Sequence, residues 1–227
     1  MKGLRLGAAA LLCAGAVWAA DAVVDGGPTA FVVSEGAGRD GTMELKWDNG
    51  QLGWSIVWDP GYESTWVGND FDVGTLKWAR AVILKFKFYT CGAWPNEGWD
   101  GVRLGFYSFG GGVPGSMLWP TSGGGYFFKP SAGIQAHIWV ECDINWVCPS
   151  TKFVAAEQQF YRYPQCDPFS LDNNTSFQGC SWQYSQGVWS PYEGFYVYRN
   201  VMIRVFVDED TSAVAPTSVG RVKALYY

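Results

Sequence analysis

The chain has 227 residues, of which 17% are aromatic and only 16% are charged, and it contains 29 glycines and 11 prolines. Its net charge of −5 gives a surface that repels phosphate backbones, so we exclude nucleic acid as a partner. No basic cluster or basic amphipathic helix indicates binding to an anionic membrane. Abundant aromatic residues between glycine-rich turns favour one domain built of short strands.

The first 22 residues have the features of an export signal. Lys2 and Arg5 precede the short apolar stretch LGAAALLCAGAVWA, and two small-x-small cleavage sites follow. We therefore predict a signal peptide over residues 1–22, removed together with Cys13, and an extracellular or cell-surface protein. No later stretch reaches transmembrane length, so we expect no membrane insertion. Residues 23–42 are glycine-rich and polar and are predicted to be a flexible lead-in.

From residue 43 onward, alternation of apolar and polar residues predicts eight or nine short strands. They are expected at 43–47, 54–58, 84–88, 102–107, 126–128, 137–144, 153–160, 181–185 and 201–207. The turn Asp48-Asn49-Gly50 is a strong hairpin signal between the first two of these strands. The glycine-rich segment 110–116 predicts a tight connection that a helix could not tolerate.

The alternation also predicts which side chains face the core. The strands around 84–88 and 102–107 are expected to pair in a sheet with one buried face, carrying Leu84, Phe86, Phe88, Val102, Leu104 and Phe106. In the strand 137–144 the inward residues are expected to be Ile138, Val140, Cys142 and Ile144. In the strand 201–207 they are Val201, Ile203, Val205 and Val207.

No window of the sequence carries a helical stripe of apolar residues. Short strands without helices predict an all-β fold, an antiparallel β-sandwich of jelly-roll type, as a single domain over residues 43–210. After Val207 the chain becomes acidic, then small and proline-bearing. This composition predicts a linker and short C-terminal tail over residues 211–227.

Six cysteines are present, and five remain once Cys13 is removed with the signal. Disulfides are the first expectation in an oxidising compartment. Cys142 and Cys148 can pair only if the chain turns between them, because an extended chain would hold them roughly 20 Å apart. Cys166 and Cys180 bracket a turn-rich segment and form the other predicted pair. Cys91 is then either buried and free or exchanged into a pair with Cys142. With a single histidine in the chain, zinc binding by these cysteines is not expected.

Catalysis has little support in the sequence. His137 is the only histidine, and it lies on a predicted strand without a nucleophile motif nearby. Two carboxylates across a cleft would suffice for glycoside cleavage, and the candidates for such a pair are Glu97, Asp100, Glu141 and Asp143. Solvated surface acids are the favoured interpretation of these residues, so we expect no enzyme activity and no catalytic residue.

Loop tryptophans provide the candidate binding site. Trp94 and Trp99 lie in the segment AWPNEGWDG, and Trp119 follows the Gly-Pro turn. Flat indole rings on loops of a rigid sandwich can stack on sugar rings, while Asn96, Glu97 and Asp100 bind hydroxyl groups. The alternative is that the rings fold back over the ends of the sandwich. The other tryptophans considered, which are expected to be core or cross-strand partners, are Trp47, Trp54, Trp58, Trp139, Trp182 and Trp189.

Oxygen ligands for a structural Ca²⁺ are a further consideration. Asn69, Asp70, Asp72 and the acidic run 208–210 could supply them, but no loop shows ordered ligand spacing. A solvated turn is the favoured interpretation, and no cofactor is expected.

Several short motifs occur in a characteristic order along the chain: WDNGQLG, VGNDFDVG, GVPGSMLW, SWQYSQGVW and VMIRVFVD. Together they resemble a jelly-roll module appended to secreted bacterial proteins, including those of type IX secretion and related surface systems. The resemblance covers about residues 43–210, and it implies a non-catalytic accessory role. The chain departs from the family pattern in its extra cysteines and in lacking a catalytic neighbour. The final PTSVGRVKALYY is similar to a short C-terminal segment of such proteins, with a final edge strand or a frayed tail as the alternative.

These observations lead us to expect an exported, non-catalytic accessory or surface module with a structural or binding role. Its expected partner is a polysaccharide or a cell-surface protein. The alternatives are a carbohydrate-binding module that uses Trp94, Trp99 and Trp119, and a small carboxylate-dependent glycoside hydrolase.

Overall fold

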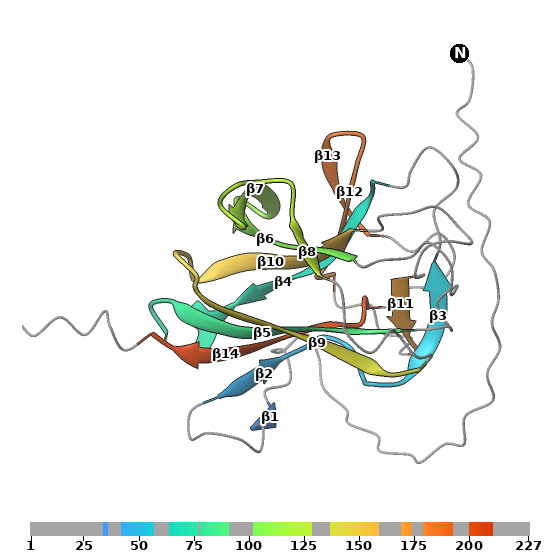
Figure 1. The fold of residues 1–227 in the computed structure, drawn as a ribbon, viewed down its shortest axis with the longest axis horizontal. Helices are drawn as coiled ribbons and strands as arrows, with labels where there is room; N and C mark the ends of the chain where they lie inside the picture. Colours follow the sequence, from blue (N-terminus) through green and yellow to red (C-terminus); the bar gives the residue numbers. More distant parts are fainter. Residues whose placement is uncertain are drawn as a thin grey trace, which may run out of the picture.

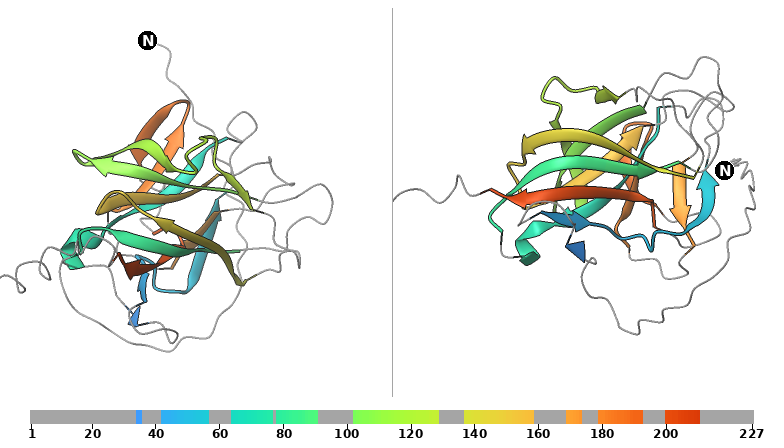
Figure 2. Two further views of the ribbon diagram at one scale, coloured as in Figure 1. Left: turned by 60° about the vertical axis from the view of Figure 1, so that its left-hand side comes forward. Right: turned by 60° about the horizontal axis from the view of Figure 1, so that its bottom comes forward.

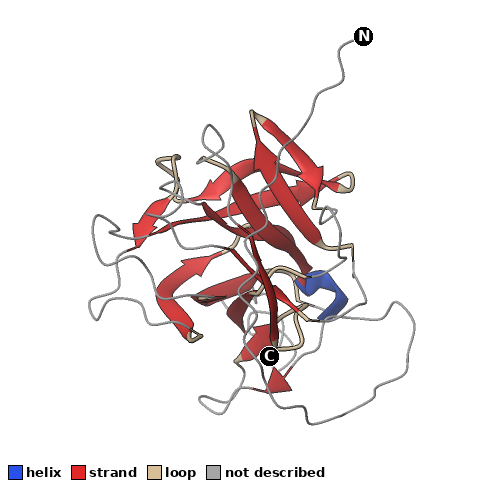
Figure 3. Ribbon diagram, turned by 90° about the vertical axis from the view of Figure 1, so that its right-hand side faces the viewer, coloured by secondary structure: helices blue, strands red, loops and turns tan. Residues whose placement is uncertain are grey.

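The structure is a computed structural model. It describes residues 34–35, 42–56, 64–76, 78–90, 102–128, 137–158, 169–173, 179–192 and 200–210. Within these ranges the only helical element is a single 3-10 turn, η1 (Val73–Leu76), and all other regular structure is strand (Figure 3).

The strands form two packed layers and a small third sheet (Figure 1). The five-stranded sheet has the order β1 (Ser34–Glu35), β2 (Met43–Leu45), β14 (Ile203–Glu209), β5 (Ala81–Tyr89) and β9 (Trp139–Val147). The seven-stranded sheet has the order β13 (Val188–Pro191), β12 (Ser181–Ser185), β4 (Trp66–Asp72), β10 (Lys152–Gln158), β6 (Val102–Gly110) and β7 (Val113–Trp119), with β8 (Tyr126–Phe128) also paired to β6. The third sheet pairs β3 (Leu52–Ile56) with β11 (Phe169–Asp172).

All of these strand pairs are antiparallel, so the predicted antiparallel β-sandwich is confirmed. The two larger sheets stack face to face, as the two further views show (Figure 2). The core between them is built on five fully buried phenylalanines, Phe71, Phe86, Phe88, Phe106 and Phe153. In β14 and the residues before it, the predicted inward residues Val201, Ile203, Val205 and Val207 are all buried.

The strands β5 and β6 belong to different sheets, which corrects the prediction that they pair. They face each other across the core, and the rings of Phe86 and Phe106 are 6.0 Å apart between centroids. Alternation predicts which face of a strand is buried, but a strand in either layer of a sandwich has one buried face. The long connection between β5 and β6 therefore crosses from one sheet to the other.

Three of the predicted inward residues in and beside the five-stranded sheet, Leu84, Ile138 and Ile144, are not fully buried. The pairing of β5 with β9 shifts register between Ile83 and Lys85, so Ile83 is fully buried and Leu84 is only half-buried. On the partner strand, Val140 and Cys142 are buried as predicted. Ile138 lies before β9 begins and is 37% exposed.

The turn Asp48-Asn49-Gly50 does not form the predicted hairpin, because β2 pairs with β14 and β3 pairs with β11. The carboxylate of Asp48 instead accepts three hydrogen bonds from the guanidinium of Arg204, and a fourth from the backbone N–H of Gly50. The ring of Trp139 lies 4.1 Å from the same guanidinium. The turn thus closes over a buried ion pair on the outer face of the five-stranded sheet.

A second buried polar cluster joins the two layers. Asn69 of β4 is fully buried, and its amide donates to the backbone carbonyls of Val201 and Ile203. Its side-chain oxygen accepts from the hydroxyl of Ser181. Because each buried polar group here has a partner, the cluster connects the sheets at one defined register.

The cysteines do not form the predicted Cys142–Cys148 disulfide, and both thiols are free and buried. The chain does not turn between them, since β9 runs from Trp139 to Val147. The two cysteines are six positions apart along extended chain, which corresponds to roughly 20 Å. Cys180 is also free and buried, while its predicted partner Cys166 and the remaining Cys91 lie outside the described residues.

The predicted boundaries differ from the structure at two further points. Ser34–Glu35 forms β1 inside the predicted lead-in and pairs with β2. The predicted connection 110–116 is a turn only at Gly111 and Gly112, whose φ values are positive, and β7 begins at Val113. Among the described residues, no helix is both long and apolar enough to cross a membrane.

Candidate functional site

The seven-stranded sheet is curved so strongly that β13 and β7, at opposite ends of its strand order, come into contact. Two hairpins, β6–β7 and β12–β13, therefore rise on either side of its outer face (Figure 1). Both hairpins have two-residue turns with positive φ, at Gly111-Gly112 and at Gln186-Gly187. The outer face of this sheet is consequently concave.

A groove of about 560 Å³ lies on this concave face between the two hairpins. Its described lining comes from β4, β6, β7, β10, β12, β13 and the adjoining turns. The lining residues are Trp66, Arg103, Tyr107, Gly115, Ser116, Met117, Gly124, Gln158, Tyr184, Gly187 and Trp189.

A row of aromatic rings crosses the groove. Trp66 and Tyr107 meet edge to face with centroids 5.5 Å apart, and Tyr107 meets Trp189 in the same way at 4.9 Å. Tyr184 lies 5.2 Å from Trp189. Trp66 and Tyr107 are buried and form the floor, whereas Tyr184 and Trp189 are half-buried and leave part of their surface available to a ligand.

Two glycines allow the floor to be packed this way. A Cβ at Gly105 would lie 3.2 Å from the Trp66 ring, and one at Gly125 would lie 2.5 Å from it. Gly125 also has a φ of +84°, which a larger residue adopts only with strain. The indole of Trp66 is therefore held between the backbone of β6 and the turn before β8.

The polar part of the groove lies where β6 begins and the antiparallel strand β10 ends. Nη1 of Arg103 donates to Oε1 of Gln158 over 3.4 Å, and Nε2 of Gln158 donates to the backbone carbonyl of Ser64 over 2.8 Å. The amide of Gln158 is thus oriented by the backbone and in turn orients the guanidinium of Arg103. Among the described lining residues, Arg103 is the one charged residue, and none is a carboxylate.

The concave face beyond the groove carries a partly buried acid. Burial raises the pKa of Asp70 on β4 to about 6, although its carboxylate accepts a 2.7 Å hydrogen bond from the indole N–H of Trp182. Within the groove, burial raises the pKa of Tyr107 well above its usual range, with a smaller contribution from Tyr184. The hydroxyl of Tyr107 is therefore neutral at every physiological pH.

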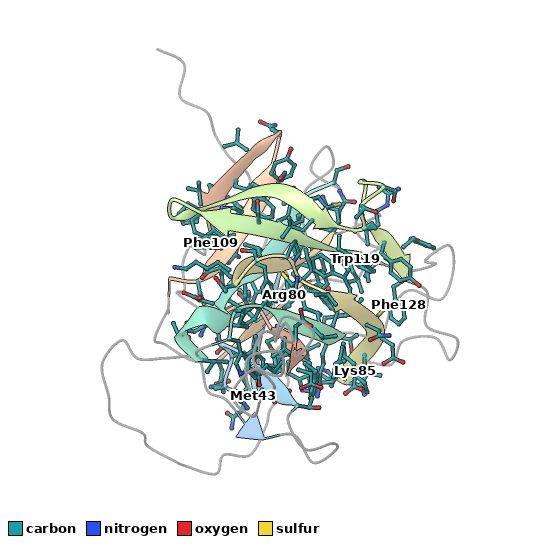
Figure 4. All side chains as sticks on the ribbon, turned by 90° about the vertical axis from the view of Figure 1, so that its left-hand side faces the viewer. Met43, Arg80, Lys85, Phe109, Trp119 and Phe128 are labelled. Carbon is teal, nitrogen blue, oxygen red and sulfur yellow. The ribbon has the colours of Figure 1, made fainter. Side chains whose placement is uncertain are left out.

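Of the predicted binding residues, the structure describes Trp119. It lies on β7 opposite Phe106, and its ring packs 5.8 Å from Phe106 and 5.2 Å from Tyr126, so it covers the edge of the core and does not line the groove. Figure 4 shows it toward the opposite end of β6 from Phe109. The other predicted binding residues, Trp94, Asn96, Trp99 and Asp100, lie outside the described residues. A binding role for this set stays a prediction.

The acids considered for glycoside cleavage do not converge in the part of the chain that is described. Glu141 and Asp143 are exposed on β9, and Lys85 lies 2.9 Å from Glu141 and 4.0 Å from Asp143. The hydrogen bond from Lys85 lowers the pKa of Glu141. This favours the ionised form that an ion pair requires, whereas a general acid must hold its proton and needs a raised pKa. Glu97 lies outside the described residues, and His137 is exposed before β9.

The residues considered as Ca²⁺ ligands point in different directions and have different partners. Asn69 faces the core, whereas Asp70 on the same strand faces outward to Trp182. Asp72 lies 3.1 Å from Lys152, and Asp210 pairs with Arg80. In the described ranges no three His, Cys, Asp or Glu residues gather as a metal site.

Sequence reasoning did not identify the groove. Trp182 and Trp189 were expected as core or cross-strand partners, and both do pack in the aromatic cluster of the concave face. Trp66, Tyr107 and Tyr184 had no predicted role. Only Tyr107 carried a signal, because in the predicted strand 102–107 it lies on the polar side of the alternation with Arg103. Trp66 lies in no predicted strand, and Tyr184 shares a face with Trp182 in the predicted strand 181–185.

Comparisons of the chain with protein-family models, with curated proteins and with solved structures found no match.

Proposed function

We propose that the protein is an exported, non-catalytic binding module whose ligand is a carbohydrate chain held in the groove. The observation that carries the proposal is the pair of half-buried rings, Tyr184 and Trp189, standing in a concave site beside the polar groups of Arg103 and Gln158. Ligand sites in proteins are typically concave and largely apolar, with a few fixed polar groups. This combination suits a sugar, because a sugar ring has an apolar face and a polar rim.

The dimensions of the site support the same conclusion. A volume of about 560 Å³ falls within the range of roughly 300–1,000 Å³ that is usual for small-ligand sites. The glycines Gly115, Gly124 and Gly187 leave the rim of the groove without side chains. The floor is rigid, because Trp66 and Tyr107 are buried and packed on each other, so little ordering is needed on binding.

Export and an accessory role are parts of this proposal. The signal-like residues 1–22 support an extracellular or cell-surface location. The ordered motifs from WDNGQLG to VMIRVFVD support a role like that of the jelly-roll modules of secreted bacterial proteins. A protein that carries a binding groove and no convergent acids among its described residues would attach another protein, or a cell, to a polysaccharide.

Trp189→Ala tests the proposal directly. Loss of a stacked ring is expected to reduce retention of the protein on its polysaccharide in affinity electrophoresis by tenfold or more. Tyr126→Ala is the matched control, because Tyr126 is 43% exposed on β8 and does not line the groove. Near-ultraviolet circular dichroism establishes that both variants are folded. Equal retention of the two variants, or no retention of the wild type on any polysaccharide, would refute the proposal.

A further inference from the structure

Tyr107 carries a hydroxyl group that the described part of the fold does not use. Its ring packs against Trp66 and Trp189, with centroids 5.5 Å and 4.9 Å away, and 7% of the residue is exposed. Among the described residues, no group forms a hydrogen bond with this hydroxyl. The residue lines the groove and the hydroxyl is not a fully enclosed atom, so it opens onto the groove. A polar group on so buried a side chain normally has a partner, and a molecule bound in the groove would supply one.

A second tyrosine hydroxyl lies near the first. Tyr184 and Tyr107 both contact the ring of Trp189, with centroids 5.2 Å and 4.9 Å from it. Burial, and to a smaller extent Tyr184, raises the pKa of Tyr107, so its hydroxyl keeps its proton and can donate as well as accept. Tyr184 is half-buried in the lining of the same groove, and in the described ranges its hydroxyl also has no hydrogen bond to the protein. The groove thus holds two neutral hydroxyls whose hydrogen bonds are open to a ligand.

The two phenols and the indole together have the chemistry of a site for one sugar hydroxyl. A sugar hydroxyl both donates and accepts, so it can lie between two phenols, accepting from one and donating to the other. The ring of Trp189 beside them offers its face to the apolar side of the same sugar. A substituted oxygen in that position, such as an O-methyl group, could accept but not donate, and one phenol would lose its partner.

We infer that Tyr107 is a specificity-determining residue, whose hydroxyl, together with that of Tyr184, binds one unsubstituted hydroxyl group of the sugar that stacks on Trp189. Sites that hydrogen-bond a ligand hydroxyl discriminate strongly against ligands without it, because the polar groups of the site are then left unpaired. The inference rests on the proposed carbohydrate-binding function and names the chemical group that the groove recognises.

Tyr107→Phe tests the inference, because it removes the oxygen and keeps the ring. The affinity of the wild type and of the variant is measured by isothermal titration calorimetry with laminarin, galactomannan, arabinoxylan and polygalacturonate. For the polymer that the wild type binds most tightly, we expect the dissociation constant to rise about tenfold in Tyr107→Phe, since a ligand hydroxyl then lacks its partner inside the groove. Tyr126→Phe is the matched control, because it removes the same group at a 43% exposed position outside the groove lining and should bind as the wild type does.

The stability of the ligand-free protein separates recognition from a structural role. Because no described residue bonds to the hydroxyl, its removal should leave the urea midpoint of Tyr107→Phe equal to that of the wild type or higher. A lower midpoint would show that the hydroxyl stabilises the fold, and it would overturn the inference. A double-mutant cycle with Tyr184→Phe then tests whether the two phenols share one ligand group. The double variant should lose less affinity than the product of the two single losses, because hydrogen bonds to one group strengthen each other.

The failures of the two proposals are distinguishable. Unchanged affinity of Tyr107→Phe, for a polymer whose binding Trp189→Ala abolishes, would overturn the inference and leave the carbohydrate site in place. Independent losses in the double-mutant cycle would overturn the shared ligand hydroxyl. Absence of wild-type binding to all four polymers would overturn the proposed function, and the inference with it.

Discussion

Glu157 is a buried acid whose ionisation should make the stability of the protein fall as pH rises. It follows Phe153 and Ala155 on the inward side of β10 and is 4% exposed. Its neighbours in register are Val67 on β4 and Leu104 on β6, both buried and apolar. Burial alone raises its pKa from 4.5 to about 8.

The sign of the effect follows from proton linkage. The folded state holds the proton of Glu157 up to about pH 8, whereas the unfolded chain releases it near pH 4.5. The contribution to stability is therefore fully present below pH 4.5 and is lost as the pH rises through 8. At 1.36 kcal/mol for each pKa unit, the whole effect is about 5 kcal/mol, and roughly half of it falls between pH 5.5 and 7.5.

Glu157→Gln removes the ionisation with little change of shape. Relative to wild type, the free energy of unfolding of this variant is expected to rise by roughly 2–3 kcal/mol between pH 5.5 and 7.5. Urea denaturation at several pH values, followed by tryptophan fluorescence, measures this difference. Glu141→Gln is the control, because the carboxylate of Glu141 is exposed and its lowered pKa places its effect below this pH window. Parallel pH profiles for wild type and Glu157→Gln would refute the reasoning.

Four further predictions concern the frame of the sandwich and the groove. Asn69→Ala breaks the polar connection between the sheets and should lower the free energy of unfolding by about 3 kcal/mol in urea titrations. Asp70→Asn should flatten the loss of stability that the wild type shows as pH rises from 4 to above 6, measured by thermal melting. Gly125→Ala should displace the floor of the groove and weaken polysaccharide binding in calorimetry. The thiols of Cys142 and Cys148 should resist alkylation until the protein is unfolded, as peptide mapping would reveal, because burial raises their pKa values to about 12 and about 11.

Local alternation was sufficient to predict the strands with one clearly apolar face. In the segment 201–207 a β-branched residue recurs at every second position, and all four of these predicted inward residues are buried. Alternation contains no information about which layer a strand joins. It therefore could not predict that β5 and β6 lie in opposite sheets. The inward position of Ile83 in place of Leu84 depends on a register shift against β9, which is a property of the pair of strands.

Local sequence patterns likewise could not predict the long-range polar contacts. The signal of Asp48-Asn49-Gly50 for a hairpin is real as a turn signal, and the chain does turn there. Its partner, however, is Arg204, which lies 156 residues away. A local pattern cannot show that a turn residue will pair with a distant arginine.

The groove illustrates the same limit at the level of function. Trp66, Tyr107, Tyr184 and Trp189 come from four strands, and each alone is typical of a core or cross-strand aromatic. They form one surface only because the large sheet curves until β13 and β7 meet. The sequence predicted stacking of sugar rings on the loop residues Trp94, Trp99 and Trp119, of which only Trp119 lies in the described part of the chain, and this stays a prediction.

A crystal structure of the protein with an oligosaccharide derived from a polysaccharide that it retains tests the central claim most directly. We predict a sugar ring against Trp189 in the groove on the concave face. An oligosaccharide bound elsewhere on the sandwich, with the groove empty, would contradict the account.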